Sequence, residues 1–92
     1  MNLIILSYDV SVDSDRKVFN IVSRYLIHRH KSVFDGYLSE SSLYVLLREL
    51  REIIDLEKDS ILIYSVKKNG FKDRLCIGRS VFPEDDFYIA DT

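Results

Sequence analysis

The feature that most constrains the fold is a continuous apolar run near the start of the chain, LIILSYDV from Leu3 to Val10, which ends in Tyr8 and Asp9. Such runs are typical of a strand in the middle of a sheet, where at least one face is covered. A carboxylate at the end of such a strand either caps the next helix or contributes to a metal site. We therefore expect a central strand over residues 2–8, and Asp9 is the first candidate functional residue.

Two amphipathic helices are predicted after this strand. Apolar residues spaced by three and four predict a helix from about Ser14 to Ile27, with Asp13 or Ser14 as its N-cap. The segment from Leu43 to Ile54 has the clearest helical periodicity in the chain, because its leucines and isoleucines recur at the spacing of one helical face. Both helices should therefore place one apolar stripe against a common core.

Further strands are predicted around and after the second helix. They are Lys31 to Leu38, Ser60 to Val66, Leu75 to Gly78 and a possible edge strand at Phe87 to Ala90. The first of these contains Gly36, which suggests a bulge or a close backbone approach, and one bent strand cannot be distinguished there from a tight pair. The turn residues KKNGF predict a hairpin between the second and third.

The order of these elements favours an α+β fold of the ferredoxin-like kind: an antiparallel sheet with two helices on one face and a C-terminal edge strand. The chain has 92 residues, of which 47% are hydrophobic, so it suits one domain. We assign residues 1–79 to that domain and residues 80–92 to a C-terminal tail, for which strand exchange onto a partner is an expectation. A domain of this size leaves much surface uncovered, which weakly favours a homodimer.

Charge is distributed unevenly along the chain although its net value is only −2. No acid occurs between Arg16 and Phe34, whereas seven acids and three bases occur between Asp35 and Asp59. The acid-free stretch supplies the candidate nucleic-acid contacts, namely Arg16, Lys17, Arg24, His28, Arg29, His30 and Lys31. The alternative is an ordinary solvated surface.

Cellular location is constrained by the single cysteine and by the absence of a long apolar run. Cys76 has no partner for an intramolecular disulfide, and we expect it to pack in the core. No apolar run approaches the roughly 18 residues of a membrane span, and Met1 leads directly into the first strand. We expect a cytoplasmic protein with no membrane partner.

Several motifs together resemble the second CRISPR-associated core protein family (Cas-two). They are YDV at the end of the first strand, an Arg-Lys pair at the start of the first helix, SVFDG, and DSILIY after the leucine-rich helix. Their order and spacing from Asn2 to Gly78 make the resemblance far more specific than any single motif. It implies a ferredoxin-like homodimer that acquires new spacers together with the CRISPR integrase subunit. Members of the family have also been credited with metal-dependent cleavage of RNA or duplex DNA.

The resemblance implies specific roles for matching residues. Asp9 matches the proposed metal ligand, which faces its twin across the dimer axis, and Tyr8 accompanies it as a second catalytic candidate. Magnesium or manganese would then be bound by Asp9 of both protomers, because one carboxylate per chain is too few. Ser32 and Phe34 match residues near the dimer axis. Capping of the next helix remains the alternative use of Asp9.

Two functions remain open at this point. The first is a dimeric scaffold that holds a DNA duplex for the integrase, with magnesium-dependent endonuclease activity on RNA or DNA as a further property. The second is a stand-alone, metal-dependent endoribonuclease of the toxin-like type. We favour the scaffold. The tail carries an apolar segment, Phe87, Tyr88 and Ile89, which we expect to bind the other protomer or the integrase by strand addition.

Overall fold

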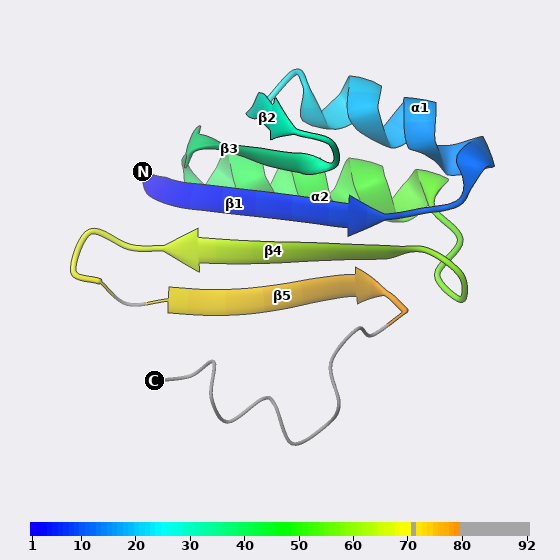
Figure 1. The fold of residues 1–92 in the computed structure, drawn as a ribbon. Coiled ribbons are helices and arrows are strands. Elements are labelled where there is room, and N and C mark those ends of the chain that lie inside the picture. The colour runs from blue at the N-terminus through cyan, green and yellow to red at the C-terminus, as the bar shows by residue number, and fades with distance from the viewer. Residues whose placement is uncertain (71, 80–92) are drawn as a thin grey trace.

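A five-stranded antiparallel sheet with two helices makes up the part of the chain that the computed structural model describes, residues 1–70 and 72–79 (Figure 1). The elements are β1 (Asn2–Asp9), α1 (Val12–Val22), β2 (Ile27–His30), β3 (Val33–Leu38), α2 (Glu40–Ile53), β4 (Ser60–Val66) and β5 (Lys72–Gly78). The sheet order is β2-β3-β1-β4-β5. The α+β fold and the central position of the first strand are confirmed. The predicted strand at 87–90 and the tail at 80–92 lie outside the described residues.

The two faces of the sheet differ because side chains alternate along each strand. On β1, Ile4, Leu6 and Tyr8 are buried against the helices. The residues between them point to the opposite face, which neither α1 nor α2 covers (Figure 1). That face, called here the open face, carries partly exposed apolar side chains from three strands: Leu3, Ile5, Val33, Leu62, Tyr64, Val66 and the more exposed Tyr37.

The first helix is shorter than its apolar pattern suggests. It begins at Val12 and ends at Val22, so the predicted boundaries were wrong at both ends. Its N-cap is Ser11 rather than Asp13 or Ser14, and the Ser11 side chain makes no capping hydrogen bond. The apolar residues after Val22 instead enter the turn and the strand β2.

The second helix agrees with its pattern. It begins after Ser39, whose side chain accepts a hydrogen bond from the amide of Ser42 at 3.2 Å, as an N-cap residue should. Leu46 and Leu50 are fully buried in the same core cluster as the α1 residues Val18 and Val22. The two helices therefore share one core on one face of the sheet.

The segment from Lys31 to Leu38, where the sequence does not distinguish one bent strand from a tight pair, contains the single strand β3, and β2 precedes it in residues where no strand was predicted. β2 pairs with β3, and the register shifts between His28 and His30. Gly36 lies on β3, opposite Ile4, without a bulge. A Cβ atom at Gly36 would lie 3.1 Å from the Leu26 side chain, so the close approach is what favours glycine here.

The β4–β5 hairpin is also present, although β5 is longer than predicted and begins at Lys72. Cys76, expected in the core, is exposed on β5. Side chains alternate between the two faces along β5, so Cys76 lies on the face opposite the buried Ile77, and β5 is an edge strand with a neighbouring strand on one side only. Among the described helices, none is long and apolar enough to cross a membrane.

Candidate functional site

The candidate site lies where β1 ends, at one edge of the molecule. The register places Asp9 beside Ser60 of β4, and Ser60 beside Gly78 of β5. Three adjacent strands therefore present one residue each in a row across this end of the sheet. Neighbouring strands lie about 4.8 Å apart, so a long side chain at the end of β5 can reach Asp9.

Asp9 carries an exposed carboxylate, as a ligand-binding residue would. Its side chain is 80% exposed, and Oδ2 accepts a hydrogen bond from Nη2 of Arg79 at 3.3 Å. The two residues are 70 positions apart in sequence. The capping alternative receives no support, because the amides of Ser14 and Asp15 at the start of α1 bond to the carbonyl of Ser11.

A single chain does not fit a metal centre at Asp9. Within residues 1–70 and 72–79, no group of three or more His, Cys, Asp and Glu side chains is placed to hold a metal ion. Asp9 offers one carboxylate, and its charged neighbour is a guanidinium rather than a second oxygen ligand. Divalent ions prefer several oxygen ligands, so further ligands would have to come from a second copy, from water or from nucleic acid.

Asp59, just before β4, is a second aspartate at this end of the sheet, and sequence reasoning missed it. Its side chain is fully buried. It accepts hydrogen bonds from the amide of Ser11 at 2.8 Å, the hydroxyl of Ser14 at 2.9 Å and the amide of Asp55 at 2.9 Å. Burial alone would raise the pKa of Asp59, but these hydrogen bonds outweigh it and hold the pKa below its ordinary value. Asp59 therefore fixes the loop that follows Asp9.

Predicted cations approach the same end of the sheet from α1, from β2 and from the β2–β3 turn. Lys31 lies in the β2–β3 turn, next to the end of β1, because the adjacent Ser32 carbonyl accepts a hydrogen bond from the Tyr8 amide at 3.3 Å. Arg16 and Lys17 are exposed on the first half of α1. His30, on β2 beside that turn, is also exposed. These four side chains remain candidates for phosphate contact.

Two other predicted cations are paired with acids of the chain. Arg24 binds Glu49 at 3.1 Å, and Arg29 binds Asp35 at 2.9 Å. In both pairs a base from the acid-free stretch meets an acid from the acidic stretch. The separation of charge along the sequence is thus partly cancelled by the fold, and Arg24 and Arg29 are less available to phosphate than Arg16 and Lys17.

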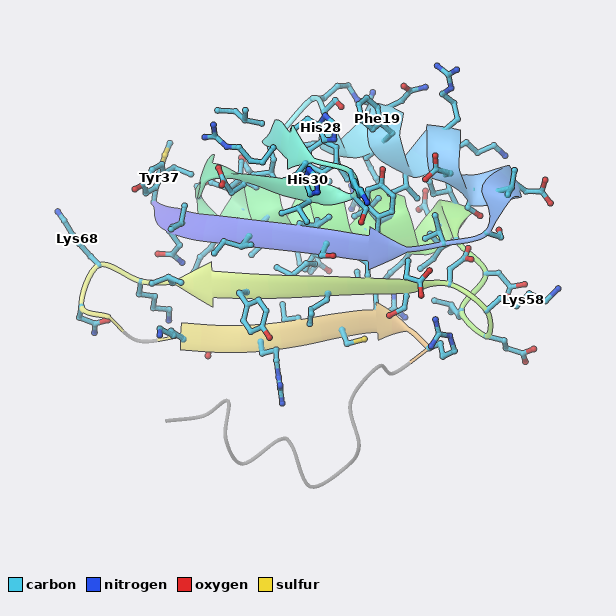
Figure 2. All side chains as sticks on the ribbon, viewed as in Figure 1. Phe19, His28, His30, Tyr37, Lys58 and Lys68 are labelled. Carbon is cyan, nitrogen blue, oxygen red and sulfur yellow. The ribbon has the colours of Figure 1, made fainter. Side chains whose placement is uncertain are left out.

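The aromatic candidates lie on the helix side of the sheet, away from the Asp9 carboxylate. Tyr8 is almost fully buried and stacks on Phe34, with ring centroids 6.1 Å apart. Burial raises the pKa of Tyr8, and the charge of Asp15 adds to this effect. His28 packs edge-on against Phe19 at 5.0 Å, and Figure 2 shows these two rings together beside α1. Tyr8, His28 and Phe34 therefore belong to the packing around α1.

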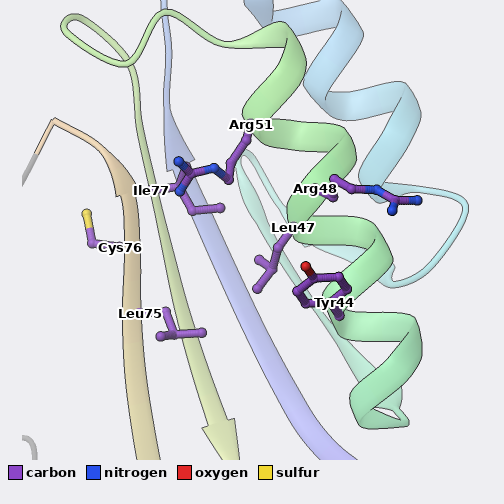
Figure 3. A pocket seen from close by; sticks show the side chains of 7 residues that line it. All are labelled: Tyr44, Leu47, Arg48, Arg51, Leu75, Cys76 and Ile77. Carbon is purple, nitrogen blue, oxygen red and sulfur yellow. The ribbon is translucent and has the colours of Figure 1, made fainter.

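A groove of about 420 Å³ opens elsewhere, between α2 and the edge strand β5 (Figure 3). Apolar side chains form much of it, with two arginines on its helix side: Tyr44, Leu47, Arg48, Arg51, Leu75, Cys76 and Ile77. It does not include Asp9. The predicted partner-binding residues Phe87, Tyr88 and Ile89 lie outside the described residues.

Both the sequence and the fold of this chain are similar to those of known proteins. Residues 1–74 match the family described as CRISPR associated protein Cas2. A relative from Moorella thermoacetica, named CRISPR-associated endoribonuclease Cas2 2, is 32% identical over 89 residues, covering 90% of this chain and 98% of the relative. CRISPR-associated endoribonuclease Cas2 from Nanoarchaeum equitans is 36% identical, covering 80% of this chain and 81% of the relative.

Solved structures agree with this assignment. A structure described as a crystal structure of cas2 is 36% identical, with a TM-score of 0.70, over 89% of this chain and 92% of the other. A hypothetical protein, TT1823 from Thermus thermophilus, is 31% identical with a TM-score of 0.68, over 86% of this chain and 95% of the other. The similarity therefore covers nearly the whole described domain, including the strand that ends in Asp9.

Proposed function

This chain belongs to the CRISPR-associated protein Cas2 family, and from that premise we propose that it is a dimeric scaffold that holds duplex DNA for the CRISPR integrase during spacer acquisition. The observation that carries the proposal is the match over residues 1–74, which includes Asp9 and the basic start of α1. The curated relatives are named endoribonucleases. Cleavage of RNA or duplex DNA is therefore the second candidate activity.

The homodimer is supported by the open face of the sheet. Leu3, Ile5 and Tyr64 lie there, partly exposed, with further apolar side chains around them. Large contiguous apolar surfaces are uncommon on monomeric proteins and usually mark an interface. A second copy of the chain, placed against this face, would bury it and would bring a second Asp9 into the assembly.

Magnesium or manganese is proposed to bind between the Asp9 carboxylates of the two protomers. A single chain supplies too few ligands, as described above. When bound, the ion would supply positive charge at a scissile phosphodiester. Asp9 would hold it, and its high exposure leaves room for phosphate and water.

Duplex DNA is proposed to lie across the exposed cations around the end of β1. Arg16, Lys17, His30 and Lys31 point to solvent and form no ion pair with any residue that the structure describes. Contacts of this kind are made to phosphates and give affinity without sequence preference. The integrase is proposed to bind the tail through Phe87, Tyr88 and Ile89.

One substitution, Asp9→Ala, distinguishes the proposed scaffold function from the proposed nuclease activity. We expect Asp9→Ala to abolish metal-dependent cleavage of RNA and duplex DNA and to leave binding of a forked duplex, alone or with the integrase, within about twofold of the wild type. The triple substitution of Arg16, Lys17 and Lys31 by Gln should instead weaken duplex binding and reduce its salt slope by roughly three units. An unchanged salt slope in the triple variant would contradict the proposed DNA surface.

Dimerisation is tested on the open face. Ile5→Glu places a charge at the centre of that face, and we expect sedimentation equilibrium at micromolar protein to show a 10.8 kDa monomer. Glu52→Ala, an exposed change on α2, is the control and should leave the dimer intact. A wild-type protein that sediments only as a monomer would contradict the dimer itself.

A further inference from the structure

Arg79 is held in place from three sides at the end of β5. Its amide donates to the carbonyl of Asp59 at 2.7 Å, and its Nε donates to the carbonyl of Lys58 at 3.2 Å. Its Nη2 donates to Oδ2 of Asp9 at 3.3 Å. The guanidinium therefore bridges the loop before β4 and the carboxylate at the end of β1.

The backbone around Gly78 makes this position possible. Gly78 has a φ of +89°, and a Cβ atom there would lie 2.2 Å from the carbonyl oxygen of Asp59. Only glycine allows the end of β5 to approach that carbonyl so closely. Since Asp59 is itself fixed by three hydrogen bonds, a continuous series of contacts joins the start of α1 to Arg79, and it is buried at Asp59 and exposed at Arg79.

We propose that Arg79 is an internal counter-ion of Asp9, a positioning residue that occupies the carboxylate until a divalent cation displaces it. This inference rests on the proposed role of Asp9 as a metal ligand. In a single chain the guanidinium lies next to the one carboxylate that Asp9 offers, where a cation would have to bind. The contact thus sets a threshold for metal binding.

The exposure of the Arg79 and Asp9 side chains determines how strongly Arg79 affects metal binding. The side chains of Arg79 and Asp9 are 44% and 80% exposed, so the ion pair is weak and a divalent ion can break it. The same positive charge nevertheless opposes a second cation at the same carboxylate. Removing the charge should therefore tighten metal binding by about fivefold rather than by orders of magnitude.

The experiment measures binding of Mn²⁺ to the full chain, by the electron paramagnetic resonance signal of the free ion at low ionic strength. We expect Arg79→Gln to bind Mn²⁺ about fivefold more tightly than the wild type. Arg79→Lys keeps a positive charge and should remain within about twofold of the wild type. Arg51→Gln, an exposed arginine of α2, changes the net charge equally and should also leave the affinity unchanged.

The outcomes separate this inference from the proposed function. If Asp9→Asn removes Mn²⁺ binding but Arg79→Gln does not tighten it, Asp9 is a ligand and Arg79 is not its counter-ion. If Arg79→Lys tightens binding as much as Arg79→Gln, the charge is not the cause and the inference fails. If Asp9→Asn leaves binding intact, both the inference and the metal part of the proposed function fail, while duplex binding still tests the scaffold separately.

Discussion

Asp9 and Asp59 lie at the same end of the sheet, one closing β1 and the other just before β4, and their side chains meet opposite surroundings. Asp59 is fully buried and accepts two hydrogen bonds from the loop and helix that follow Asp9 and a third from the amide of Asp55 in the loop before β4. Asp9 is mostly exposed and has one weak ion pair. The oxygens of Asp59 accept hydrogen bonds that stabilise the fold, whereas most of the acceptor positions of Asp9 are open to a ligand.

This comparison is tested most strongly by deleting the buried carboxylate. Asp59→Ala should lower the free energy of unfolding by about 3 to 5 kcal/mol, because it leaves the buried hydroxyl of Ser14 and the partly buried amides of Ser11 and Asp55 without an acceptor. The measurement is urea denaturation of both proteins at the same concentration, which keeps the concentration-dependent contribution of dimerisation equal. A loss below about 1 kcal/mol would mean that water replaces the carboxylate and that Asp59 is not the anchor of this end.

A smaller loss is expected when the approach of β5 to Asp59 is obstructed. Gly78→Ala should cost about 2 to 3 kcal/mol in the free energy of unfolding, from backbone strain at positive φ and from the clash with the Asp59 carbonyl. Gly70→Ala is a matched control, because Gly70 has a φ of +87° but nothing within 4 Å of its Cβ position. Equal losses in the two variants would show that strain alone, without the contact, explains the effect.

Protonation of Asp59 at low pH should also destabilise the fold. The loss should be smaller than that of Asp59→Ala, because a protonated carboxyl group still accepts some hydrogen bonds. The pKa of Asp59 is lowered in the folded state, so its stabilising effect is fully present above the unfolded pKa of about 3.9. That effect is lost as the pH falls through the folded pKa. Melting temperatures measured from pH 7 to pH 2 should therefore converge for the wild type and Asp59→Asn, and parallel curves would contradict this assignment.

The smallest change is expected at the exposed carboxylate. Asp9→Ala should alter the free energy of unfolding by less than about 0.5 kcal/mol, because an exposed ion pair contributes little. Urea denaturation beside Asp59→Ala gives the direct comparison. A loss of 2 kcal/mol or more would make Asp9 a structural residue and would remove the basis for calling it available to ligands.

The two aspartates also show what sequence patterns can and cannot reveal. The continuous apolar run predicted β1, and the leucine spacing predicted α2, because both are repeated patterns that depend only on neighbours in sequence. Asp9 stood out because it ends such a run. Asp59 looked like one more acid in an acidic stretch, because its burial depends on Ser11 and Ser14, more than 40 residues away.

Other differences between the predicted and the observed structure also depend on contacts between segments that are distant in sequence. The apolar pattern of the first helix continued past Val22, but residues there pack in a turn and in β2 rather than in another helical turn. Arg79 was not a candidate. It follows β5, and its contact with Asp9 at the end of β1 reaches across β4, the strand that lies between them. Cys76 was predicted to be buried from its apolar neighbours, and only the sheet order reveals that its strand is at the edge.

The central position of β1 has a consequence for how the chain is made. β1 pairs with β3 and with β4, yet β4 begins only at Ser60. At about 5 to 20 residues per second, roughly 3 to 12 seconds of synthesis separate the first strand from its second neighbour. During that interval both edges of β1 are unpaired until β3 has been made, and one edge is unpaired until β4 follows. Of the five described strands, β1 is thus synthesised before the others and waits for β4 before both of its edges are paired.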